Sequence, residues 1–179
     1  MNIAFLSDQS LPHVYERIKS LSRYNHNVSL ISWPIKNNDY IYDCLLMPKP
    51  RSIKKIYWLI QNILRLRKYI GNNNIEILHI MGIGSSVYGF FLNSTKFIIE
   101  HNGSDILVDP IKRPFLEFYY KTAYFYSDAI VQDSIISRDA GINIGASGKN
   151  NEVIDIGVDF EIFNDSVSLG VARKKYKVS

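Results

Sequence analysis

Short apolar segments alternate with helical segments along almost the whole chain, and this alternation constrains the fold more than any other feature. Segments with strand character cover 2–6, 28–32, 42–47, 75–80, 96–99, 129–131 and 153–156. Between them, apolar spacings of three and four predict helices from about 11, over 52–70, up to about 92, over 114–126 and from 134. Apolar strands separated by helices are typical of a parallel sheet covered on both faces. The sequence therefore predicts an α/β fold, a doubly wound parallel sheet.

The composition excludes several other classes of protein. The chain has 179 residues, of which 46% are hydrophobic and 21% charged, which fits one globular domain. No apolar run approaches the roughly 18 residues of a membrane span. The single cysteine, Cys44, excludes an internal disulfide and a cysteine-based zinc site. The first residues lack the features of a signal peptide, so we expect a cytoplasmic protein.

Polar and glycine residues follow the predicted strands at the places where ligands bind in parallel sheets. Ligands of open α/β sheets lie beyond the carboxyl ends of the strands. Each of these segments contains residue types suited to hydrogen bonding or to a close approach of the backbone. The site candidates of this kind are Ser7, Gln9, Gly82, Gly84, His101, Asn102, Gly103, Asp105, Gly157 and Asp159.

The turn after the strand at 75–80 comes close to a dinucleotide-binding motif. Residues 82–87 read G-I-G-S-S-V, and the next strand is followed by Glu100, where such a site places its ribose-binding acid. This pattern favours an NAD-linked oxidoreductase. However, Val87 occupies the position of the third glycine, where its side chain obstructs close packing of helix and strand. The alternative is a tight turn at a helix start, whose amides still favour an anion.

The four histidines share no spacing suited to a metal ion, so no metal site is expected. His101 differs from the others because it follows an apolar strand directly and precedes a polar loop. An imidazole there could donate a hydrogen bond or a proton near neutral pH. Equally, it could hold a neighbouring loop in place.

Positive charge is concentrated in one segment of the chain. The net charge is +4, yet no acidic residue lies between Cys44 and Ile75, where seven residues are basic. These are Lys49, Arg51, Lys54, Lys55, Arg65, Arg67 and Lys68. Such a patch attracts anionic surfaces. The aromatic residues of 115–126 lie apart from this patch and are expected in the core, which argues against a nucleic-acid partner.

The helix predicted over 52–70 carries this charge, and Gly71 is expected to end it. Its apolar stripe consists of Ile53, Ile56, Tyr57, Ile60, Ile63 and Leu64. One hypothesis is a crossover helix whose charges are solvated. The other is attachment to an anionic membrane surface through Lys54, Lys55, Trp58, Arg65 and Lys68. In both, we expect the apolar stripe to pack against the sheet.

Taken in order, the strand-end motifs resemble the amino-terminal domain of a family-4 glycosyltransferase, a retaining enzyme of GT-B fold. Residues 1–7 form the first strand, and residues 25–31 are similar to the family's G-H-x-V turn into the second. Residues 75–79 are similar to its D-I-v-H strand, and residues 100–106 to its H-G-s-D-i motif. Residues 153–159, with Phe163, are close to its v-i-p-n-G-V-D-x-x-x-F motif.

The resemblance implies a Rossmann-like domain, one half of a GT-B fold, over 1–163, followed by a hinge over 164–179 toward a carboxy-terminal donor domain. It implies transfer of a sugar from a nucleotide-sugar donor to a glycan or lipid-linked acceptor, with retention of configuration. It also implies no metal or other cofactor, a donor held by the second domain, and inactivity of this chain alone. A cytoplasmic enzyme at the inner face of the membrane fits such acceptors. An NAD-linked oxidoreductase and a non-catalytic Rossmann-like binding module remain as alternatives.

The resemblance also assigns roles to the site candidates. Aligning Gly103 and Asp105 with the family motif places the family's active-site histidine on Asn102, with His101 one residue earlier. Either side chain is then the catalytic group. Gly82 permits close backbone approach, as does Gly84. Asp105 is expected to organise the loop, and the remaining candidates bind substrate or lie near the hinge.

Overall fold

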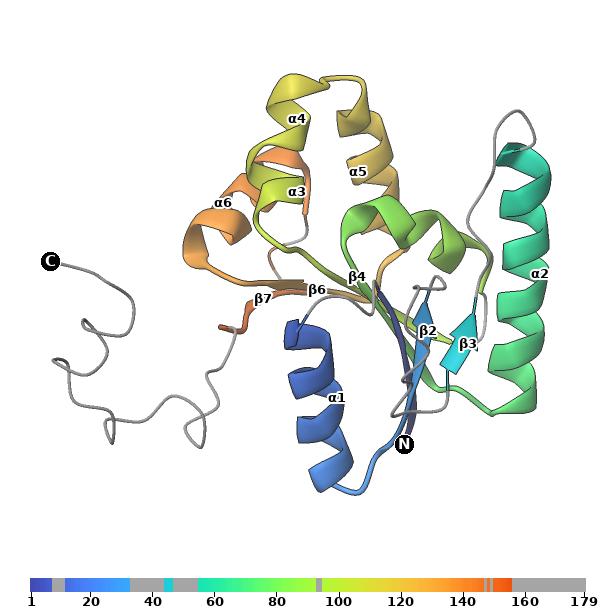
Figure 1. Ribbon diagram of the computed structural model, residues 1–179. Helices are drawn as coiled ribbons and strands as arrows, with labels where there is room; N and C mark the ends of the chain where they lie inside the picture. The colour runs from blue at the N-terminus through green and yellow to red at the C-terminus, as the bar shows by residue number, and fades with distance from the viewer. Residues whose placement is uncertain are drawn as a thin grey trace, which may run out of the picture.

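The fold is described by a computed structural model over residues 1–7, 12–32, 44–46, 55–92, 95–146, 148 and 150–155. Its strands form one seven-stranded sheet in the order β3-β2-β1-β4-β5-β6-β7, and all neighbouring strands are parallel (Figure 1). The strands are β1 (Asn2–Leu6), β2 (Asn27–Ser32), β3 (Cys44–Leu46), β4 (Ile77–Met81), β5 (Lys96–Glu100), β6 (Ala129–Gln132) and β7 (Asn151–Val153). The predicted doubly wound α/β fold is therefore confirmed.

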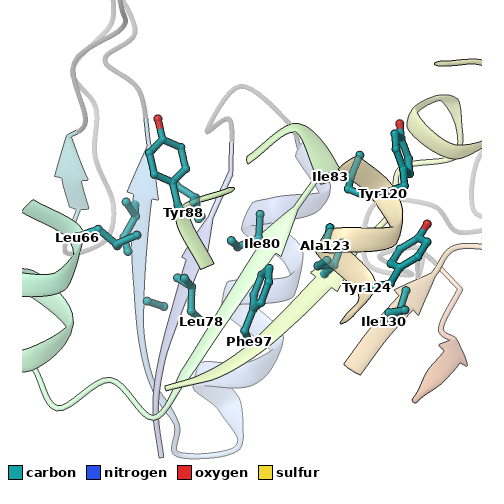
Figure 2. Packing of buried hydrophobic residues seen from close by; sticks show 14 of the residues in the cluster. Leu66, Leu78, Ile80, Ile83, Tyr88, Phe97, Tyr120, Ala123, Tyr124 and Ile130 are labelled. Atoms are coloured by element: carbon teal, nitrogen blue, oxygen red, sulfur yellow. The ribbon is translucent and has the colours of Figure 1, made fainter. Parts of the chain in front are cut away.

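Helices cover the two faces of the sheet unequally. They are α1 (Pro12–Arg23), α2 (Lys55–Asn72), the 3-10 helix η2 (Ile83–Phe91), α3 (Ser104–Leu107), α4 (Asp109–Lys112), α5 (Leu116–Tyr126) and α6 (Ile135–Ile144). Helix α1 covers one face, where Val14 and Ile18 pack on Phe5 and Leu30. The larger core lies on the opposite face, where buried side chains of α2, η2 and α5 gather over β4 and β5 (Figure 2).

The strand order places the candidate site. The chain leaves β1 toward β2 on one side and returns from β3 to β4 on the other side of β1. The carboxyl ends of β1 and β4 therefore flank the point where the direction of winding reverses, the place where open α/β sheets bind ligands. The segments that follow β4, β5 and β6 meet at this edge.

Helix α2 corrects the prediction for the basic segment. Ile56, Ile60 and Leu64 of the predicted inward stripe are 75%, 51% and 59% exposed, and Tyr57 is exposed beside them. The face that packs on the sheet consists of Leu59, Ile63, Leu66 and Ile70, so the prediction is confirmed for Ile63 of the stripe. Both faces have helical spacing, so periodicity alone did not distinguish them.

The end of α2 also differs from the prediction. The helix continues through Gly71 to Asn72, and Asn74 takes the left-handed conformation with a φ of 50°. The amide of Asn74 donates to the carbonyl of Gly71 at 3.4 Å, and that of Ile75 donates to the carbonyl of Ile70 at 3.0 Å. Such a pair of hydrogen bonds closes a helix, and asparagine tolerates the conformation that it requires.

The aromatic segment is divided between core and surface. Tyr120 and Tyr124 are buried, but Phe115, Phe118 and Phe125 are 76%, 80% and 82% exposed. The prediction of a core helix is therefore wrong for the three phenylalanines. The segment before α5, predicted as a loop, contains the short helices α3 and α4. Strand β7 begins two residues earlier than predicted and ends at Val153.

Replacing Gly89 with Ala tests the packing of η2 on the sheet. A Cβ at Gly89 would lie 2.6 to 2.7 Å from three ring atoms of Phe97, a buried side chain. We expect a loss of about 1–3 kcal/mol in the free energy of unfolding, measured with urea. Gly71→Ala is the control, because a Cβ there meets nothing within 4 Å and alanine favours a helix by about 1 kcal/mol over glycine. Equal stability of Gly89→Ala and wild type would contradict this packing.

Candidate functional site

Two glycine turns bring the carboxyl ends of β4 and β5 together. Gly82 and Gly103 have φ values of 89° and 74°, a region that side chains rarely adopt. The amide of Gly82 donates to the carbonyl of Glu100 at 2.8 Å. A Cβ on Gly82 would lie 3.7 Å from Nδ2 of Asn102. The Asn102 amide group therefore lies directly against the bare backbone of Gly82.

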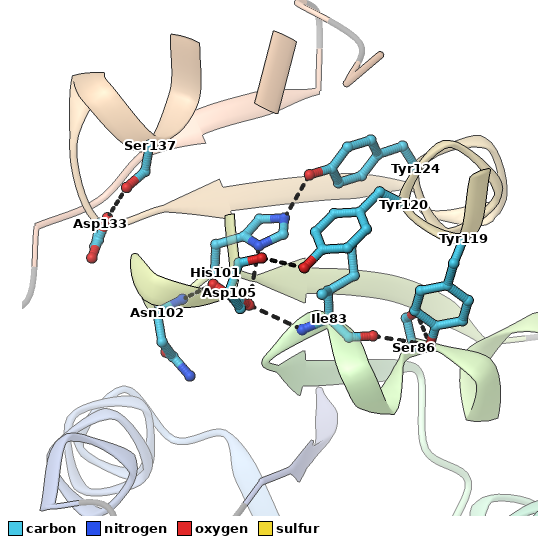
Figure 3. A network of polar contacts seen from close by, with 10 residues as sticks. All are labelled: Ile83, Ser86, His101, Asn102, Asp105, Tyr119, Tyr120, Tyr124, Asp133 and Ser137. Atoms are coloured by element: carbon cyan, nitrogen blue, oxygen red, sulfur yellow. Dashed lines mark hydrogen bonds and ion pairs between the residues drawn. The ribbon is translucent and has the colours of Figure 1, made fainter. Parts of the chain in front are cut away.

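Asp105 fastens these two turns to each other (Figure 3). Its Oδ1 accepts a hydrogen bond from the Asn102 amide at 3.0 Å, and its Oδ2 accepts one from the Ile83 amide at 3.1 Å. Oδ2 also lies 3.2 Å from Nδ1 of His101. Burial alone would raise the pKa of Asp105, but His101 and the two amides outweigh burial and hold this pKa below its usual value. The ionised carboxylate thus holds the loop after β5 against the turn after β4.

His101 is enclosed behind these turns. Its side chain is 0% exposed, and its Nε2 lies 3.0 Å from the hydroxyl of Tyr124. Its ring lies nearly parallel to that of Tyr120, with centroids 6.4 Å apart. Burial, followed by the charge of Asp105, raises the pKa of Tyr124, so its hydroxyl remains protonated. Both ring nitrogens of His101 are occupied, and the ring faces the protein interior.

Asn102 has the opposite surroundings. Its side chain is half-buried at the edge of the sheet, and its Oδ1 is inaccessible to water yet has no hydrogen-bond partner among the described residues. A buried amide oxygen without a partner costs free energy. Of the two side chains that the sequence left open as the catalytic group, Asn102 therefore lies at the edge, with unused hydrogen-bonding capacity.

Asp133 directly follows β6, in one of the strand-end segments where ligands were expected, but it was not selected as a site residue. Its Oδ1 accepts hydrogen bonds from the hydroxyls of Ser137 at 2.6 Å and Ser134 at 3.2 Å. Its Oδ2 points toward Gly103, where an added Cβ would lie 3.1 Å away. The strand-end position of Asp133 was the available signal, but nothing in the sequence ranked it above its neighbours.

The remaining candidates are placed unequally. Ser7 is 2% exposed at the end of β1, and its Oγ has no hydrogen-bond partner within the part of the chain described. An added Cβ on Gly84 meets no atom within 4 Å, so this turn is open. Gln9, Gly157, Asp159 and Lys54, with the predicted hinge, lie outside the described residues. Along α2, Trp58 is half-buried, whereas Arg65 and Lys68 are exposed; the side chain of Lys55 is not described.

The surroundings of Glu100 do not support a dinucleotide site. Its carboxylate is 1% exposed and contacts Arg17 at 2.8 Å and His79 at 2.9 Å, so it is not free to bind a ribose. Amides of the adjoining turn are occupied as well. Asp105 accepts from the Ile83 amide, and the Tyr119 hydroxyl accepts from the Val87 amide at 3.1 Å.

Two further properties concern the described residues as a whole. No group of three or more histidine, cysteine, aspartate or glutamate side chains among them is placed to hold a metal ion. No helix in the described ranges combines the length and the apolar character needed to cross a membrane.

Comparisons with known proteins identify a family and a fold. The family model described as "Glycosyl transferase 4-like" matches residues 2–134. No curated protein matches the chain.

Solved structures match over nearly the whole chain at low sequence identity. HepE (Alr3699) of Anabaena, in complex with UDP and glucose, is 15% identical with a TM-score of 0.71, over 99% of this chain and 50% of that one. Sucrose-phosphate synthase of Thermosynechococcus elongatus is 12% identical with a TM-score of 0.76, over 100% and 53%. The lipopolysaccharide outer core galactosyltransferase WaaB, in its apo form, is 11% identical with a TM-score of 0.69, over 89% and 47%. The chain thus has the fold of one half of these GT-B proteins and spans about half their length.

Replacing Glu100 with Gln tests the buried contacts of its carboxylate with Arg17 and His79. Burial raises the pKa of Glu100, but His79 and Arg17 outweigh it, so this pKa lies below its ordinary 4.5. Ionised Glu100 therefore stabilises the fold above about pH 4.5, and this contribution disappears as the pH falls through the lowered pKa. We expect Glu100→Gln to lose about 3 kcal/mol in the free energy of unfolding at pH 7 and less at acid pH. The exposed Glu152→Gln is the control, and a loss at Glu100 that does not change with pH would contradict the pairing.

Proposed function

The chain belongs to the glycosyl transferase 4-like family, and on this basis we propose that it is the amino-terminal, acceptor-side domain of a sugar transferase. The enzyme would move a sugar from a nucleotide-sugar donor to a glycan or lipid-linked acceptor. The chain spans about half the length of HepE and of sucrose-phosphate synthase, which supports a two-domain enzyme. HepE in complex with UDP and glucose supports a donor of the nucleotide-sugar type.

The observation that carries this proposal is the unpaired amide oxygen of Asn102 at the carboxyl edge of the sheet. An asparagine side chain both donates and accepts hydrogen bonds, and a rotation of the Asn102 amide would bring its water-inaccessible oxygen to a sugar hydroxyl. Gly82 and Gly103 form the two positive-φ turns on either side of it, and they let the Asn102 amide and the Asp133 carboxylate lie close to the backbone there. The Oδ2 of Asp133, which lies beside Gly103 and receives no hydrogen bond from the described residues, is a further acceptor for a hydroxyl hydrogen.

His101 acts as a positioning residue in this proposal. Its ring lies behind the turn and contacts the Asp105 carboxylate, which accepts a hydrogen bond from the Asn102 amide. Loss of the ring would loosen Asp105 and, through it, the orientation of Asn102. A displacement of about 1 Å in a group that positions the substrate lowers the rate of the reaction substantially.

The donor half completes the mechanism. We propose that a second domain binds the nucleotide sugar and that positive groups and helix amino termini stabilise the leaving diphosphate without a metal or other cofactor. We also propose that the configuration at the transferred sugar is retained, as the family resemblance implies. The chain by itself, lacking the donor-binding half, would then transfer no sugar.

The location that we propose is the inner face of an anionic membrane, with α2 as the contact. The outward face of α2 carries exposed Ile56, Ile60 and Leu64, and Arg65 and Lys68 are exposed on the same helix. Each basic residue near an anionic bilayer contributes on the order of 1 kcal/mol within a Debye length of about 8 Å. The apolar face adds a hydrophobic contribution that the sequence prediction had assigned to the core.

In the enzyme joined to its donor domain, replacing Asn102 with Ala is expected to lower the rate of sugar transfer about 100-fold or more. The stability of the fold should change little, because the amide oxygen has no described partner to lose. The exposed Asn143→Ala on α6 is the matched control, with a rate near wild type. Transfer rates within twofold of wild type for Asn102→Ala would refute this site.

The proposed membrane contact predicts binding that depends on lipid charge. The chain should co-sediment with vesicles that contain acidic lipid, bind little to neutral vesicles, and dissociate as the salt concentration rises. Replacing Lys54, Lys55, Arg65 and Lys68 with Gln should weaken this binding strongly and leave the circular dichroism spectrum unchanged. Binding that ignores lipid charge would show that the basic helix is only a solvated crossover.

A further inference from the structure

A second exposed apolar face lies on α5 and the corner before it. Phe115, Phe118 and Phe125 are 76%, 80% and 82% exposed, and Ile111 of α4 is 80% exposed. Residues 115, 118, 122 and 125 follow each other at helical spacing, so they share one face over about 15 Å. We call Ile111, Phe115, Phe118 and Phe125 the aromatic stripe. Large apolar patches exposed on a protein surface often mark an interaction site.

Polar groups along the aromatic stripe are already satisfied. The hydroxyl of Thr122 donates to the carbonyl of Phe118 at 2.8 Å, so this residue does not interrupt the stripe with an unpaired group. The carboxylate of Glu117 is paired with Lys121 at 2.7 Å. The acidic group on this helix beside the stripe is therefore neutralised by a neighbouring lysine.

The corner between α4 and α5 combines apolar and basic side chains. Residues 111–115 read I-K-R-P-F, and all five are exposed. Lys112 and Arg113 have no ion pair within the described part of the chain. Two unpaired cations between two exposed apolar side chains match the interface of an anionic bilayer, where phosphates meet acyl chains. A protein partner would instead have to supply fixed acids for both cations.

We infer that the aromatic stripe is a second lipid contact, which inserts into the interfacial zone of an anionic membrane while Lys112 and Arg113 bind the phosphates. This rests on the proposed membrane location and adds to it. In Figure 1, α5 lies on the same side of the sheet as α2, and the α4–α5 corner projects away from α1. Contacts through both α2 and α5 would fix the orientation of the domain on the surface, which α2 alone cannot do.

The test compares two double variants by co-sedimentation with vesicles of phosphatidylcholine and about 30% phosphatidylglycerol. Phe115→Ser with Phe118→Ser removes half of the stripe, and Ile135→Ser with Ile136→Ser removes two exposed side chains of α6 as the matched control. Thermal unfolding checks that both keep the fold. We expect the phenylalanine variant to bind about tenfold more weakly and to dissociate at lower salt, because insertion, unlike charge attraction, resists salt. The isoleucine control should bind within twofold of wild type.

A second measurement reports on the stripe itself. In the Phe118→Trp variant, the fluorescence gained over wild type should be quenched by brominated acyl chains. The second contact would be overturned if the phenylalanine variant bound as tightly as wild type. It would also be overturned if brominated chains did not quench the gained fluorescence of membrane-bound Phe118→Trp. Either result would leave attachment by α2 intact. No binding of wild type to these vesicles would overturn both. Sedimentation showing a dimer that only the phenylalanine variant dissolves would identify the stripe as a protein interface and refute the inference.

Discussion

The candidate site depends on one interaction, the Asp105 carboxylate that joins the turns after β4 and β5. One carboxylate oxygen accepts a hydrogen bond from the Asn102 amide. The other accepts a hydrogen bond from the Ile83 amide and contacts His101. Because Gly82 and Gly103 both have positive φ, neither turn has a side chain to pack against the other at its bend. The carboxylate replaces that packing with directed, charge-assisted bonds, which are stronger than neutral ones. It leaves the Asn102 side chain at the edge with an oxygen that no described residue pairs.

Charge is used in opposite ways on the two sides of this turn. Behind it, Glu100 is buried against Arg17 and His79, which links α1 to β5 and β4 inside the fold. In front of it, Asp133 keeps one oxygen bonded to Ser137 and directs the other toward Gly103. In the first arrangement the Glu100 carboxylate stabilises the fold and is not free to bind a ligand, since a buried charge must be paired. The second leaves an acceptor open toward the glycine turn, which is what recognition of a hydroxyl requires.

The sequence predicted the strands, their parallel arrangement and the meeting of their carboxyl ends, because apolar runs and glycine turns are local signals. It could not decide which apolar face of α2 the sheet would bury, since Leu59 and Ile60 fit helical spacing equally well. Nor could it separate His101 from Asn102, because one residue of shift along a turn decides which side chain faces inward. Asp133 was not selected among the strand-end residues for a related reason: its contact with the glycine turn depends on the position of Gly103, which lies 30 positions earlier in the sequence. Contacts between residues so far apart in the sequence form only when the chain folds.

The edge around Asn102 is the place where we expect the acceptor sugar to bind. The most direct measurement is a crystal structure of the enzyme joined to its donor domain, with nucleoside diphosphate and an acceptor saccharide bound. We predict a sugar hydroxyl within about 3 Å of the Asn102 side chain, between Gly82 and Gly103, with the His101 ring still enclosed behind Asp105. A saccharide bound away from this edge, or one in contact with His101 after the ring has turned outward, would contradict this placement.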